Sequence, residues 1–246
     1  TTKPEIESIT YKPKHTSVLA KVINVLTFGN FFNEELEVTV KAKDNHPGKL
    51  TNQMSGIDTI TYYTAKDAEG TEMISDYQTV TPNSNGEISF ILDVGFEGYV
   101  FVKAKDKANN EMGEFVRKGT NIVEGSVDTD KILVIERENP NIQVTTSPAT
   151  GELVDGWYNG KVKVHVKVTD IKSGINIIKY TLGNGEEKIV DVLKDNPNEM
   201  TTYMEFDLIW DDEDGEDLPI SITVVDNAGN EVTKNDVTVN IDKKRP

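Results

Sequence analysis

Residues 162–168 read "VKVHVKV", a strict alternation of apolar and polar side chains. Successive side chains of a β-strand point to opposite faces of the sheet. A period of two therefore predicts four buried valines and an exposed row of basic residues. The same alternation occurs at 36–42, where the sequence is "LEVTVKA". Together the two stretches indicate an all-β fold.

Other motifs recur in the same order around these two strands, which indicates an internal repeat. The matched pairs are "FFN" (31–33) with "WYN" (157–159), "SGIDTITYY" (55–63) with "SGINIIKYT" (173–181), "DKANNE" (106–111) with "DNAGNE" (226–231), and "IERENP" (135–140) with "IDKKRP" (241–246). We predict two related domains in tandem, residues 1–138 and 139–246. Because similar sequence stands at both ends of each copy, we expect a longer array of such repeats.

Each copy contains about seven short alternating segments separated by clusters of Gly, Asn, Asp or Pro, which predicts an antiparallel β-sandwich. One stretch of the first copy departs from this pattern, "TSVLAKVINVLTFG" at 16–29. Its apolar residues recur at three- and four-residue spacing. Thr16 or Ser17 is suited to cap the start of a helix, and Gly29 to end it. We predict a short helix near 16–28, packed over one end of the first sandwich.

The repeated hexapeptide follows one alternating strand and precedes another, which indicates a turn. An aspartate at its first position is suited to accept backbone N–H groups two residues on. Gly229 takes a positive φ without strain, and Asn109, its counterpart, is among the few other residues that tolerate this region. We predict positive φ at both positions, with Asp226 and Asn230 pinning the turn. The alternative is a calcium-binding or catalytic carboxylate pair.

The ordered motifs "WYN…VKVTD…SGI…IKY…VVDNAGN…VNID…P" resemble the bacterial immunoglobulin-like (Big-type) tandem repeats of Gram-positive cell-surface proteins. The first copy resembles a longer variant of the same repeat. It departs from the pattern at "DKANN" and in the long segment 112–130. The resemblance implies two immunoglobulin-like sandwiches displayed outside the cell, secreted or attached to the cell wall, as stalk or adhesive modules. The family has no shared catalytic residues to transfer.

Composition excludes several classes of function. The chain has 246 residues, with 26 Lys and Arg against 42 Asp and Glu, a formal charge of −16. Such a charge repels phosphate backbones, so we predict no nucleic-acid partner. The sequence has no apolar run near the roughly 18 residues that a membrane-spanning helix needs. The absence of cysteine excludes disulfides, thiolate metal sites and a cysteine nucleophile.

The densest acidic run, "DDEDGED" at 211–217, is the strongest candidate for a metal site. Asp212, Asp214 and Glu216 supply hard oxygen ligands at alternate positions, as Ca²⁺ prefers. The run lacks the spacing of an EF-hand loop and its terminal bidentate glutamate. We interpret it as a solvated loop and assign no metal ligand.

Two surface features are candidates for binding. The pair Trp157–Tyr158 is suited to stack on a sugar, but the first copy keeps Phe31–Phe32 at the same place, which favours packing. Trp210 is in phase with the inward residues of its segment and is expected in the core. The outward row is suited either to bind an acidic partner or to discourage strand-to-strand aggregation. The row consists of Lys161, Lys163, His165 and Lys167.

No catalytic arrangement is evident in the sequence. The histidines, His15, His46 and His165, lack the spacing of metal ligands. Ser55 and Ser173 belong to the repeated "SGI" turns, and neither a G-x-S-x-G elbow nor a phosphate-binding glycine loop is present. We therefore predict no catalytic, cofactor-binding or metal-binding residues and no enzyme.

The resulting hypothesis is a non-enzymatic extracellular bacterial module that acts as a spacer or adhesive unit. Its expected partners are neighbouring repeats and an extracellular protein or carbohydrate. One alternative is a binding module for carbohydrate or a host protein, with its site in the extra loops of the first domain. Another is an accessory region of a large extracellular enzyme.

Overall fold

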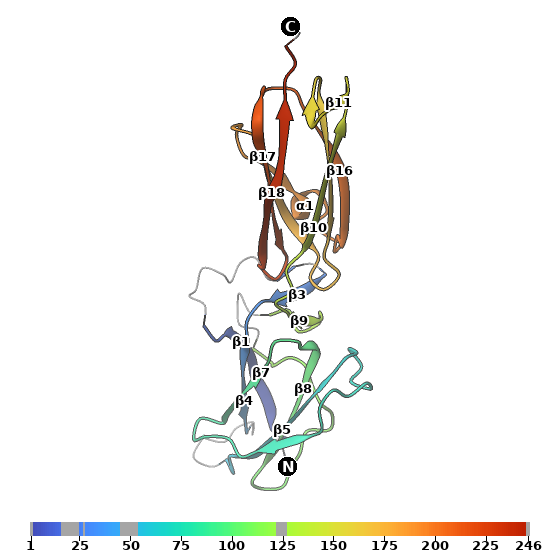
Figure 1. Ribbon diagram of the computed structural model, residues 1–246. Coiled ribbons are helices and arrows are strands. Elements are labelled where there is room, and N and C mark those ends of the chain that lie inside the picture. Colours follow the sequence, from blue (N-terminus) through green and yellow to red (C-terminus); the bar gives the residue numbers. More distant parts are fainter. Residues whose placement is uncertain (1, 16–24, 27, 45–53, 122–126, 245–246) are drawn as a thin grey trace. The chain divides into compact units, whose positions relative to one another are not determined.

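The computed structural model describes residues 2–15, 25–26, 28–44, 54–121 and 127–244. In these residues the chain is all-β apart from one short helix, and it consists of two compact units, Thr1–Glu136 and Arg137–Pro246 (Figure 1). Each unit has its own hydrophobic core.

The first unit contains nine strands in its described residues, arranged in two sheets. They are β1 (Glu5–Pro13), β2 (Val25–Leu26), β3 (Gly29–Phe32), β4 (Leu36–Lys43), β5 (Ile57–Ala65), β6 (Gln78–Val80), β7 (Glu87–Leu92), β8 (Glu97–Asp106) and β9 (Leu133–Ile135). One sheet has the order β1-β4-β7 and the other β2-β3-β9-β8-β5-β6.

The second unit repeats this arrangement. Its elements are β10 (Asn141–Pro148), β11 (Leu153–Val154), β12 (Trp157–Tyr158), β13 (Val162–Thr169), β14 (Ile175–Leu182), β15 (Lys188–Asp191), α1 (Val192–Asp195), β16 (Tyr203–Trp210), β17 (Gly215–Asp226) and β18 (Glu231–Ile241). The sheet orders are β10-β13-β16 and β11-β12-β18-β17-β14-β15. Strand for strand, these orders match those of the first unit.

The alternation in the sequence correctly predicts both cores. The four valines of β13 are fully buried, and so are Leu36, Val38 and Val40 of β4. Each core also contains residues of the six-stranded sheet, such as Ile60 in the first unit and Ile178 in the second. Two sheets that share one core make each unit β-sandwich-like.

The sheets are not wholly antiparallel, contrary to the prediction. In each unit one short strand joins the six-stranded sheet beside the last strand and runs parallel to it. Phe31 lies opposite Val134, and Trp157 lies opposite Asn240. The first strand of each unit, β1 or β10, belongs to the three-stranded sheet, and the parallel strand, β3 or β12, belongs to the other. The structure thus places "FFN" and "WYN" at equivalent points.

The predicted helix near 16–28 lies almost wholly outside the described residues. Val25–Leu26, within that range, form the short strand β2. The one described helix, α1, lies instead in the second unit and was not predicted. Asp191 caps it, because its carboxylate accepts the Lys194 N–H at 2.9 Å.

Candidate functional site

The repeated hexapeptides form the same turn in both units. Asp226 accepts the backbone N–H and the side-chain N–H of Asn230, both at 2.8 Å, and Asp106 binds Asn110 with the same two distances. Gly229 has φ 91° and Asn109 has φ 72°, which confirms the predicted backbone. The aspartates bind the residue four positions on, not two, so that detail of the prediction was wrong.

The repeated "SGI" segments form a second matched turn. Asp170 accepts the N–H groups of Ser173 and Gly174 at 2.9 and 2.8 Å. Asp44 likewise accepts the Gly56 N–H and the Ser55 hydroxyl, both at 2.9 Å. Both serine hydroxyls therefore lie against a turn aspartate, the Ser173 hydroxyl at 3.4 Å from Asp170. This geometry serves the turn.

The two turns of each unit are joined by one backbone hydrogen bond. The Asn227 N–H donates to the Gly174 carbonyl at 3.0 Å, and the Lys107 N–H donates to the Gly56 carbonyl at the same distance.

Burial raises the pKa of the Asp226 carboxyl. Hydrogen bonds from Asn230 oppose this shift, and the nearby Asp170 carboxylate adds to it. The polar residues that the chain repeats are thus engaged with the backbone.

The acidic run is engaged with lysines. Asp211 lies 2.9 Å from the Lys161 Nζ and 3.8 Å from the Lys243 Nζ, and Asp214 lies 3.7 Å from Lys243. Gly215 already begins β17. Across the described residues, no group of three or more His, Cys, Asp or Glu is arranged to hold a metal ion.

The aromatic pair Trp157–Tyr158 does not form a flat platform. Tyr158 is buried and donates its hydroxyl to Thr146 Oγ1 at 2.9 Å, while Trp157 is 36% exposed. Phe31 and Phe32 are both buried, so packing explains three of the four rings. Trp210 lies in the core, as its phase predicted.

The basic row of β13 faces a row of carboxylates on β16. Lys163 lies 3.6 Å from Asp207, and the two ring nitrogens of His165 lie 3.2 Å from Glu205 and 2.7 Å from Asp207. The Lys167 Nζ lies 5.4 Å from the centre of the Tyr203 ring. The sequence reasoning missed these carboxylates, although they alternate in the outward phase of "YMEFDLIW". Cross-strand pairing leaves this row less available to an acidic partner.

The other two histidines give no support for a functional site. The His15 backbone N–H donates to Glu34 Oε2 at 2.8 Å, and His46 lies outside the described residues.

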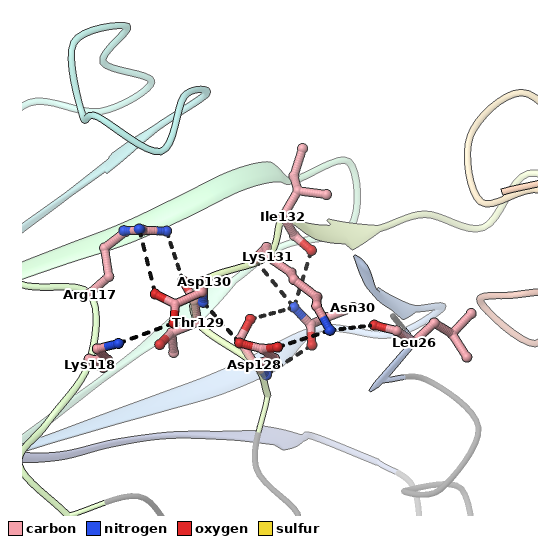
Figure 2. Close-up of polar contacts among 9 residues, drawn as sticks. All are labelled: Leu26, Asn30, Arg117, Lys118, Asp128, Thr129, Asp130, Lys131 and Ile132. Carbon is pink, nitrogen blue, oxygen red and sulfur yellow. Dashed lines mark hydrogen bonds and ion pairs between the residues drawn. The ribbon is translucent and has the colours of Figure 1, made fainter. Parts of the chain in front are cut away.

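One alternative hypothesis places a binding site in the extra loops of the first unit. Of these loops, 45–53 lies outside the described residues, and the long segment 112–130 is held internally where the structure describes it (Figure 2). The fully buried Asn30 donates its amide to the Asp128, Lys131 and Ile132 carbonyls at 2.9 to 3.3 Å and accepts the Asp128 N–H at 3.0 Å. The Lys131 Nζ reaches Asp128 at 3.0 Å, and this hydrogen bond lowers the pKa of the Asp128 carboxyl. Arg117 donates to the Thr129 carbonyl at 3.0 Å. These polar groups fix the loop on β3.

The second unit contains a cleft of about 340 Å³ between its two sheets. Tyr180 and Leu182 of β14 form one side, and Ile209 and Trp210 at the end of β16 form the other. Polar side chains surround this apolar floor. They are Asn184, Glu186, Lys188, Asp212 and Glu213.

Glu213 connects two segments of the polar rim, which is the ring of polar side chains around the cleft. Its carboxylate accepts the backbone N–H of Asn184 at 3.1 Å and the side-chain N–H at 2.5 Å. This contact ties the acidic run to the turn after β14. The acidic run was singled out from the sequence, but its part in a cleft was not predicted.

The first unit contains a cleft of about 420 Å³ at the corresponding edge. Tyr62 of β5 and Phe90 of β7 stack with ring centres 3.9 Å apart and planes 3° apart. Ser75 and Gln78 contribute polar groups, and Asp93 lies at the end of β7. Within the described residues, these two clefts are the candidate functional sites.

No protein-family model matches the chain, and no curated protein matches it in sequence. Among solved structures, the chain is similar to dimeric latent PorU from Porphyromonas gingivalis, with 16% identity, TM-score 0.33, and coverage of 99% of this chain and 24% of that one. It is also similar to a 1.5-MDa bacterial ice-binding adhesin, with 12% identity, TM-score 0.33, and coverage of 85% of this chain and 58% of that one. A third similar structure is red sea bream transglutaminase, with 11% identity, TM-score 0.28, and coverage of 99% of this chain and 32% of that one. The chain spans less than two thirds of each of these proteins, and such similarity assigns it no function.

No helix in the described part of the chain has the length and apolar character needed to cross a membrane.

Proposed function

We propose that this chain is a non-enzymatic extracellular module of a bacterial surface protein, in which two immunoglobulin-like repeats serve as a spacer or adhesive unit. One observation carries the proposal. The polar residues that recur in both units, led by Asp106 and Asp226, bind backbone groups of their own turns at matching distances. The repeated polar residues therefore maintain the folded structure of each unit.

The sequence pattern supports the same function. The ordered motifs resemble Big-type repeats, and the strand orders of the two units match. The net charge of −16 disfavours polyanionic partners such as nucleic acids and suits a protein that stays soluble at high local density.

Antibody labelling of intact bacteria that produce the protein tests the location. Antibodies raised against the 246-residue chain should label cells without permeabilisation, and external protease should remove the signal. A cytoplasmic protein of the same cells, probed in parallel, controls for lysis. Labelling that appears only after permeabilisation would contradict an extracellular module.

Purified chain coated on beads then separates the two roles. A spacer leaves the beads inert towards surfaces that the parent bacterium colonises, whereas an adhesive unit makes them attach.

A further inference from the structure

We propose that the cleft of the second unit, together with its counterpart in the first, is a saccharide-binding site. The proposal deepens the adhesive form of the proposed function and rests on it. Three observations lead to it: the clefts occupy equivalent positions, the fold itself opens them, and their linings combine an aromatic ring with hydrogen-bonding groups.

The equivalence follows from strand register. Tyr62 and Tyr180 each stand six residues after the glycine of the "SGI" turn. Tyr62 lies opposite Gln78 of β6, and Tyr180 lies opposite Lys188 of β15. On the facing sheet, Ile91 and Ile209 occupy the same place near the ends of β7 and β16. All six residues line their clefts, so the two clefts lie at the same position in the fold of their units.

The cleft of each unit arises because its two sheets have different numbers of strands. Among the described strands, each three-stranded sheet ends at β7 or β16, whereas the facing sheet continues to β6 or β15. The overhanging strands have no opposite strand to cover their inner face. The tyrosine beneath the overhang therefore remains only partly buried in both units. Because this opening comes from the topology, it persists although the lining residues differ.

The lining of the second cleft suits an amphipathic ring. The Tyr180 ring and aliphatic side chains offer an apolar surface. Around it, Lys188 is a donor, while Glu186 and Asp212 are acceptors. Glu186 and Lys188 have no hydrogen bond or ion pair within the described part of the chain, whereas Asp212 has no hydrogen bond there but its charge acts on the nearby Lys161. Sugar hydroxyls both donate and accept, so they match such a mixed rim.

Other ligand classes fit less well. A wholly apolar ligand would desolvate the charged rim without replacing its hydrogen bonds. A phosphate would face the carboxylates of Glu186, Asp212 and Glu213. An extended peptide pairing with β16 would meet Glu205 and Asp207 on that edge strand, and inward or edge charges of this kind oppose strand addition. The volumes of about 340 and 420 Å³ lie in the usual range for small-molecule sites.

The test uses the full chain and an array of immobilised oligosaccharides, followed by calorimetric titration with the strongest binder. The double variant Gln78→Ala and Lys188→Ala changes one exposed residue in each cleft. The matched control, Thr79→Ala and Ile189→Ala, changes the next residue of β6 and of β15, on the opposite face. We expect the cleft variant to weaken binding by about tenfold or more, the equivalent of one hydrogen bond to a charged group. The control should bind like the wild type.

Three outcomes would overturn the proposal: no oligosaccharide binds, the double variant binds as well as the wild type, or the clefts select members of a parallel peptide array instead. Unchanged thermal unfolding of the double variant shows that a loss of binding is local. Failure of saccharide binding would not affect the extracellular location, which the cell-labelling experiment tests, so the two proposals fail separately.

Discussion

Asp226 and Asp106 illustrate how a repeated residue serves a fold. Each is almost fully buried, and each gives both carboxylate oxygens to the asparagine four residues on. Leaving such groups unpaired in a protein interior costs about 1–3 kcal/mol. The exchange of Gly229 for Asn109 between copies preserves a positive φ and no side-chain chemistry.

This exchange leads to a prediction about position 229. Gly229→Asn should cost little stability, because Asn109 already holds the same conformation in the first unit, whereas Gly229→Ala should cost about 1 kcal/mol, since alanine is strained at positive φ. Chemical denaturation followed by tryptophan fluorescence measures both. Equal losses for the two variants would show that the left-handed backbone is not what selects the residue.

Among the elements, β13 and β16 are joined by cross-strand contacts of Lys163 and His165 with Asp207. The His165 side chain holds the pKa of the Asp207 carboxyl below its ordinary value through a hydrogen bond. A carboxyl whose pKa is lowered by folding stabilises the protein above its unfolded pKa of about 3.9, and that contribution is lost as the pH falls through the lower, folded value.

The variant Asp207→Asn should therefore be less stable than the wild type near neutral pH and converge with it in acid. Unfolding midpoints across the pH range provide the measurement, with the exposed Glu187→Gln as control. Because Asp207 is at the surface, the difference should be small and should shrink in high salt. A difference that persists at the acid end would mean that packing, and not the ion pair, is responsible.

The sequence predicted the strands and turns more completely than the clefts. Strict alternation located the buried faces of β4 and β13, and matched motifs located equivalent turns. The clefts were missed because they depend on how far one sheet overhangs the other, which no local pattern records. Tyr62 and Tyr180 were visible only as matched strand residues. The parallel strand pairs were missed because two-residue strands such as β12 carry no periodicity.

At the scale of the whole molecule, the chain is two copies of one scaffold with separate cores and differently lined clefts. Both tryptophans, Trp157 and Trp210, belong to the second unit. Their fluorescence therefore reports the unfolding of that unit within the full chain, while calorimetry reports both units.

The central claim, that the repeated aspartates are structural and act within their own units, is tested most directly by unfolding the variants Asp106→Ala and Asp226→Ala. Asp226→Ala should lower the fluorescence-detected stability by about 1–3 kcal/mol through lost buried hydrogen bonds. Asp106→Ala should leave that signal unchanged and lower the remaining calorimetric transition. Unchanged unfolding in both variants, or an equal fluorescence shift from Asp106→Ala, would contradict the claim.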